Sequence, residues 1–164
     1  MENSFIYSIQ TILERDLKKL EQEITLYPSE EALWTIAGTI KNPAGNLCLH
    51  LCGNLQHYIG AVLGGSGYIR NRDREFAARH ISREALISEI KKTNVAVKAA
   101  LEKLDPDTLD RTYPEQVFSF SMTTAYFLIH LTSHLGYHLG QVNYLRRLLL
   151  KVRLSEKPLL NLPP

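Results

Sequence analysis

The chain has 164 residues, of which 45% are hydrophobic and 22% charged, and its formal net charge is +2 at pH 7. A chain of this length buries roughly 70% of the surface that its unfolded form exposes, and this composition is typical of a globular domain rather than a disordered or fibrous one. Basic and acidic residues are interspersed and no extended basic stripe occurs, so we do not expect nucleic acid as a partner.

The sequence also indicates where the protein resides. No apolar run approaches the ~20 residues of a membrane-spanning helix, and the amino terminus lacks a basic segment followed by an apolar one, so no membrane partner is expected. Cys48 and Cys52 are four residues apart, and side chains at this helical spacing have Cβ atoms about 5–6 Å apart, too far for an ordinary disulfide. We therefore expect two reduced cysteines and a cytoplasmic location.

The first predicted element is a long amphipathic helix over residues 4–27, in which apolar side chains recur every three or four positions. Pro28 ends it. Ser29 is placed to cap a short connecting helix that carries Trp34. A second long helix is expected to start at Asn42-Pro43, with Asn42 as its cap and Pro43 as its first helical residue.

Three glycines in residues 64–67 are expected to end this second helix, because they permit positive backbone angles. Residues 70–79 read as a charged loop. Ser82 then offers a cap for a third helix that ends at Asp105-Pro106. The fourth begins near Ser119 or Ser121 and extends through Leu150.

Four long helices without a convincing series of strands predict an all-α fold, a four-helix bundle with one short connecting helix. We expect the bundle to comprise residues 1–152. Residues 153–164 contain three prolines and read as a C-terminal tail on the surface.

Histidines on the fourth helix indicate a metal site. His130, His134 and His138 are spaced four residues apart, and each step of four turns only about 40° around a helix, so neighbouring imidazoles share one face and can converge on a cation with nitrogens near 2.1 Å from it. A further ligand has to come from another helix, and the second helix offers His50 and His57.

Simpler interpretations exist for each histidine. A lone histidine on an apolar helix face is usually a hydrogen-bonded core residue, which is our interpretation of His57 and His80, and a pair at this spacing also occurs on solvated faces. His134 and His138 lie in a strongly apolar helix, where the ring nitrogens need a partner. Neither paired Glu-x-x-His motifs nor a His-Glu-x-x-His motif is present.

Three stretches together resemble the DinB-like superfamily, whose members include bacterial thiol-dependent S-transferases and mycothiol-dependent maleylpyruvate isomerase. They are LHLCGNL at residues 49–55, RDREF at 72–76 and HLTSHLGYHLGQ at 130–141. The resemblance covers nearly the whole chain apart from the tail. It implies a DinB-type bundle and a metal triad of His50, His134 and His138, with His130 as an extra histidine. Leu139 stands where relatives often carry arginine, which puts any anion-binding duty of that position in doubt.

Three neutral imidazoles leave positions on the ion open to water or substrate, as in a catalytic site, and an all-nitrogen site favours zinc or nickel. The resemblance implies a metal-dependent transferase that joins a small cellular thiol to an electrophile. A non-catalytic, stress-related metal-binding bundle and a metal-assisted hydrolase are the alternatives. Asn54, Tyr58 and Gln141 could orient a substrate, whereas the role of Glu75 stays open.

Two further expectations concern the assembly and the pH response. Relatives commonly pair through their bundles, and the first and fourth helices have more apolar residues than one core stripe requires, so a homodimer is expected. An imidazole must be neutral to bind a metal, so affinity should fall below about pH 6.

Overall fold

The computed structural model describes the backbone of residues 4–155 and the side chains of residues 4–150. It contains five α-helices: α1 (Ser4–Thr25), α2 (Ala44–Leu55), α3 (Arg72–Ala77), α4 (Arg83–Glu102) and α5 (Thr124–Ser155). The predicted all-α class is confirmed, since the described residues form no strand and only one isolated bridge, between Thr112 and Thr123. None of the described helices has the length and hydrophobicity needed to cross a bilayer.

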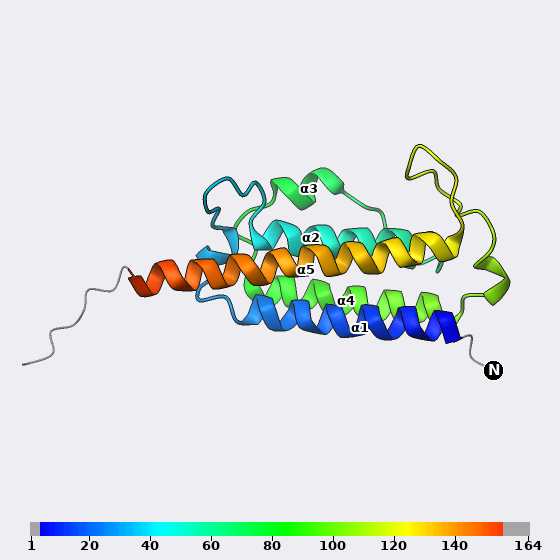
Figure 1. The fold of residues 1–164 in the computed structure, drawn as a ribbon, viewed down its shortest axis with the longest axis horizontal. Coiled ribbons are helices and arrows are strands. Elements are labelled where there is room, and N and C mark those ends of the chain that lie inside the picture. Colours follow the sequence, from blue (N-terminus) through cyan, green and yellow to red (C-terminus); the bar gives the residue numbers. More distant parts are fainter. Residues whose placement is uncertain (1–3, 156–164) are drawn as a thin grey trace, which may run out of the picture.

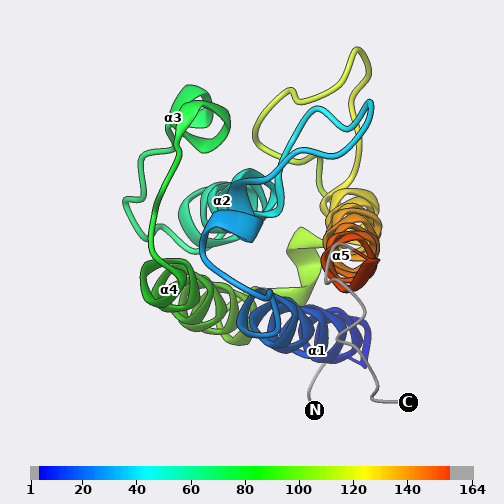
Figure 2. The same ribbon diagram turned by 90° about the vertical axis from the view of Figure 1, so that its left-hand side faces the viewer.

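The four long helices lie side by side in two layers (Figures 1 and 2). Helix α1 packs against α4 and α5, and α2 packs against the same two helices. In Figure 1, α1 and α5 run in one direction and α2 and α4 in the other. Helix α3 lies on the outer side of α2, within the connection from α2 to α4.

Large apolar side chains from the four long helices meet in one core. Leu13 of α1, Leu51 of α2, Ile90 of α4 and Phe127 of α5 are all buried, with exposed fractions of 0–1%. Burying one such side chain contributes about 1.5–3 kcal/mol. The core therefore fixes α2 against α5, and this seam carries the site described below.

Helices α1 and α4 start and end close to the positions predicted from the sequence. Ser82 caps α4, as predicted, because its hydroxyl accepts a hydrogen bond from the backbone N–H of Ala85. Ser29 accepts a hydrogen bond from the N–H of Ala32, but Glu30 rather than Ser29 occupies the cap position there. This bond lies at the short connecting helix, which is the 3-10 turn η1 (Glu31–Trp34).

The start of α2 differs from the prediction. Pro43, rather than Asn42, occupies the cap position, with extended angles of φ −69° and ψ 164°. Beyond Leu55 the helix continues as the π-helical segment η2 (Gln56–Ala61). Gly65, with a positive φ of 64°, follows the last turn, so the glycines end the helical run as predicted.

Three other predictions were wrong: the loop over residues 70–79, and the start and the end of the fourth long helix. Residues 70–79 are not a plain loop, because α3 forms there and Asn71 caps it by accepting the N–H of Arg74. Helix α5 begins at Thr124, after Thr123 accepts the N–H of Tyr126. It extends to Ser155, beyond the predicted end of this helix at Leu150, and the rest of the expected tail lies outside the described residues.

Candidate metal centre

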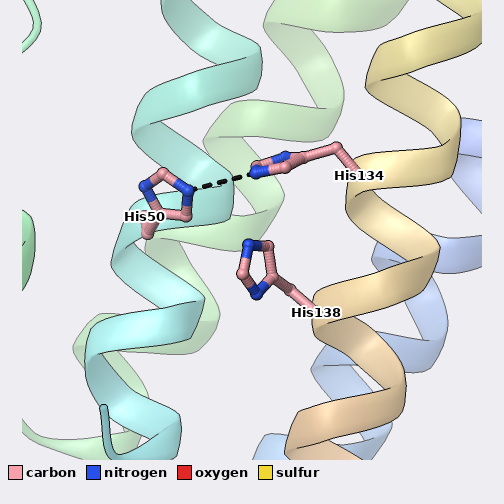
Figure 3. A group of neighbouring side chains, drawn as sticks. All are labelled: His50, His134 and His138. Atoms are coloured by element: carbon pink, nitrogen blue, oxygen red, sulfur yellow. Dashed lines mark hydrogen bonds between the residues drawn. The ribbon is translucent and has the colours of Figure 1, made fainter. Parts of the chain in front are cut away.

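The three histidines of the predicted triad come together at the seam of α2 and α5 (Figure 3). His50 projects from α2, and His134 and His138 project from consecutive turns of α5. One ring nitrogen from each lies within 4.8 Å of the other two, and the Nε2 atoms of His50 and His134 are 3.2 Å apart. Two nitrogens bound tetrahedrally at ~2.1 Å to one ion would be about 3.4 Å apart. The cluster therefore has the dimensions of a metal site.

His50 is oriented by Glu75 of α3. Its Nδ1 lies 3.0 Å from the Oε2 atom of Glu75, and a carboxylate can only accept, so the proton of a neutral His50 sits on Nδ1 and the lone pair of Nε2 faces His134. Arg70 in turn donates to both oxygens of Glu75, at 2.8 and 2.9 Å. This carboxylate–histidine pairing is the arrangement that commonly supports a metal-binding imidazole.

Glu75 carries a negative charge at neutral pH despite its burial. Burial raises the pKa of its carboxyl, but the hydrogen bonds from Arg70 and His50 and the charge of Arg70 outweigh that effect and leave the pKa below its usual value. The residue Gly53, three positions after His50, makes room for this carboxylate. A Cβ atom there would overlap the Oε1 atom of Glu75.

His138 is oriented by Gln141, whose side-chain oxygen lies 2.6 Å from its Nδ1. An amide oxygen accepts, so Nδ1 of His138 carries the hydrogen and Nε2 keeps its lone pair. The Nδ1 atom of His134 is buried and has no hydrogen-bond partner. His134 is thus the one ring of the three without an orienting partner on the far side, so a bound ion would be its main anchor.

Two of the three rings, those of His134 and His138, are held neutral by their burial. Burial lowers the pKa of His134 to about 3, with added repulsion from His138 and His50. Burial also lowers the pKa of His138. Both rings are therefore neutral at pH 7, the form in which imidazole binds a metal.

The family model described as a protein of unknown function, DUF1572, matches residues 1–156. The chain belongs to the DUF1572 family. A crystal structure of a conserved protein from Enterococcus faecalis has a TM-score of 0.73 and 14% sequence identity, and the match covers 92% of this chain and 99% of that one. At this identity the similarity shows the fold alone. No curated protein matches the sequence.

The remaining histidines of this DUF1572 chain lie outside the cluster. His130 packs face to face against Phe127, at 5.7 Å between ring centroids, and edge to face against Phe118, at 4.9 Å. His57 pairs with Glu115, at 3.0 Å. His80 is exposed in the connection after α3. The interpretation of His57 as a hydrogen-bonded residue is confirmed, although the ring is only partly buried. The interpretation of His80 as a core residue is wrong, because its side chain is exposed.

Of the three residues predicted to orient a substrate, only Gln141 contacts the histidine cluster. Gln141 contacts the triad through His138. Asn54 is buried and its Oδ1 atom has no partner, whereas the ring of Tyr58 packs against Phe127 and lies beneath the guanidinium of Arg70. Neither makes a hydrogen bond to the three histidines.

Sequence reasoning left Glu75 without a role and missed Arg70. The pair belongs to a connection between helices, where no periodicity relates a side chain to a distant site. The signal that could have indicated them is chemical: a metal-binding histidine commonly gives its second nitrogen to a carboxylate, and RDREF offers acidic candidates.

Proposed function

We propose that this chain is a divalent-metal-binding protein, with a four-helix bundle of the DinB type, in which His50, His134 and His138 hold one ion, zinc or nickel. The observation that carries this proposal is the convergence of three imidazoles from two helices, two of them with the proton fixed on the far nitrogen by Glu75 and Gln141. Oxygen-preferring ions such as magnesium and calcium fit such a ligand set poorly.

Three protein ligands suit a reactive centre rather than a structural one, because a structural zinc site is usually closed by four. His134 and His138 are only partly buried, so a small molecule can approach the ion from the seam. An ion held there would lower the pKa of a bound thiol or water. The protein residues supply the neutral rings and their fixed orientation.

We further propose a transferase that joins a low-molecular-weight thiol to an electrophilic small molecule. The thiol proton would pass to water, the sulfur would bond to the electrophilic carbon, and the leaving group would depart with its bonding pair. The thiol has to be external, because Cys48 and Cys52 are 0% and 1% exposed. A hydrogen bond with Cys52, together with burial, raises the pKa of the Cys48 thiol well above its ordinary value, so Cys48 supplies no thiolate.

The test combines elemental analysis of the purified protein with thiol-consumption assays. We expect about one equivalent of zinc or nickel and a loss of thiol, in the presence of an electrophile, that a chelator abolishes. His134→Ala should remove both metal and activity, whereas His80→Ala should remove neither. Stoichiometric metal without chelator-sensitive thiol loss would support a non-catalytic metal-binding bundle instead.

A further inference from the structure

A groove of about 480 Å³ lies beside the metal centre, between the connection that precedes α2 and the second half of α5. Volumes of about 300–1,000 Å³ are usual for small-molecule sites. Its lining residues are Ile40, Lys41, Asn42, Leu47, Gln141, Tyr144, Leu145 and Leu148. The connection projects over α2 and α5 at this end of the molecule (Figures 1 and 2).

Two residues link this groove to the triad. Gln141 lines the groove and also holds Nδ1 of His138. Leu47 lines it from α2, three residues before His50. Residues three apart are neighbours on a helix surface, and the helix rises about 1.5 Å per residue, so the groove starts about 4.5 Å along the seam from the histidines.

The walls of the groove are apolar and exposed to solvent. Ile40, Tyr144 and Leu148 line it and have exposed fractions of 39%, 78% and 44%. An apolar chain laid between them would remove this surface from water, which is favourable. Lys41 is the one charged side chain of the lining and makes no ion pair within the described residues, so an anionic group would complement it.

We propose that the groove binds the body of an amphipathic, acidic thiol, whose sulfur sits at the triad, whose apolar chain lies along Leu47 and Leu148, and whose carboxylate faces Lys41. This inference rests on the proposed function and specifies the class of thiol. A short, fully polar thiol would leave the apolar walls uncovered. The groove should therefore bind thiols with a longer apolar chain more tightly than short ones.

Calorimetric titration of the zinc-loaded protein tests this selection. Mercaptohexanoate should bind more tightly than mercaptopropionate, by up to about fourfold for each additional methylene that is buried. Tyr144→Ser and Leu148→Ser should reduce this gain. Tyr7→Ser should not, although Tyr7 on α1 is similarly exposed, at 56%. Equal affinities for the two thiols would overturn the proposal.

The role of the Lys41 charge is tested by comparing a charged with an uncharged thiol. Lys41→Met should weaken mercaptohexanoate by about two- to fivefold, the size expected of an exposed ion pair, and leave mercaptohexanol, which has no charge, unchanged. Equal losses for both thiols would show that Lys41 acts by packing and would overturn the assignment of an acidic ligand.

A metal-free arm separates this inference from the proposed function. Hexanoate, which has no thiol, should bind weakly to the metal-free protein and be weakened by Tyr144→Ser. If zinc failed to bind, the proposed function would be wrong, while such hexanoate binding would still support an acid-binding groove. If zinc bound but mercaptohexanoate gained nothing from it over hexanoate, the link between groove and metal would be refuted.

Discussion

The hydrogen bond between His50 and Glu75 joins α3 to the histidine cluster. The carboxylate keeps the proton on Nδ1 and the Nε2 lone pair directed into the site. Glu75 is itself held by two hydrogen bonds from Arg70. The orientation of His50 on α2 is therefore set by a side chain from another helix, α3.

We expect Glu75→Gln to weaken zinc binding ten- to hundredfold, the usual effect of losing such a partner, with little change in helix content. Competition with a chromophoric chelator measures the affinity, and circular dichroism checks the fold. Glu115→Gln is the matched control, because its carboxylate contacts His57 instead. Unchanged affinity in Glu75→Gln would show that Glu75 does not support the site.

The spacing of the histidines predicts much of the site. Steps of four residues on one apolar helix indicated that His134 and His138 share a face, and the structure brings them together with His50. The choice of His50 over His57 came from the family resemblance. Glu75 could not be assigned, because its position depends on how the connection carrying α3 folds back onto α2.

Two glycines within the helices differ in what surrounds them, and only one of them is needed for packing. Gly53 of α2 lies against the carboxylate of Glu75, and a Cβ atom would collide with it. Gly136 of α5 has nothing within 4 Å of where its Cβ would be. Both lie within long helices. Replacing each by alanine therefore compares the effect of a steric clash, at Gly53, with the effect of helix propensity alone, at Gly136.

We expect Gly53→Ala to displace Glu75, weaken zinc binding and lower the free energy of unfolding by about 1–3 kcal/mol, the typical cost of overpacking. Gly136→Ala should instead raise it by about 0.5–1 kcal/mol, because alanine favours a helix. Urea unfolding of the metal-free proteins measures both. A stable Gly53→Ala with full zinc affinity would contradict the packing described.

Periodicity predicted the long helices because each buries an apolar stripe, but it did not predict the short elements. Helix α3 has only six residues, and its place on α2 depends on tertiary bonds such as that from Asn46 to the backbone oxygen of Glu75, at 2.7 Å. The π-helical segment η2 likewise has no sequence pattern that distinguishes it from an α-helix.

The response to acid belongs to the whole molecule. The pKa of His134 is about 3 in the folded, metal-free protein and about 6.5 in an unfolded chain. Between these values the unfolded state binds more protons at His134, so the contribution of His134 to the free energy of unfolding should fall as the pH falls from 6.5 and stay constant above it. Metal affinity was expected to fall below about pH 6. Because burial lowers the pKa of His134, protons should compete with the metal for this ring only at a lower pH.

Urea unfolding of the metal-free protein between pH 6.5 and 5 tests this response, because most carboxyl groups remain ionised in that range. His134→Asn should show a smaller loss of stability on acidification, since asparagine does not titrate. An equal loss in both proteins would mean that His134 is not buried as a neutral ring.

We also expect a homodimer in solution. Exposed apolar side chains on α5 include Tyr126, Ile129 and Tyr137, with exposed fractions of 50%, 53% and 66%, and covering them in an interface would be favourable. Sedimentation velocity at micromolar concentration measures the assembly. A monomer alone would refute this expectation.

Zinc titration of the metal-free protein at pH 7, followed by calorimetry, tests the metal site most directly. We expect one ion per chain, and loss of that binding in His50→Ala, His134→Ala and His138→Ala. His57→Ala should bind as the original chain does, because its ring pairs with Glu115 outside the cluster. Stoichiometric binding that survived each of the three triad substitutions would show that other residues hold the ion, and would contradict the assignment of this centre.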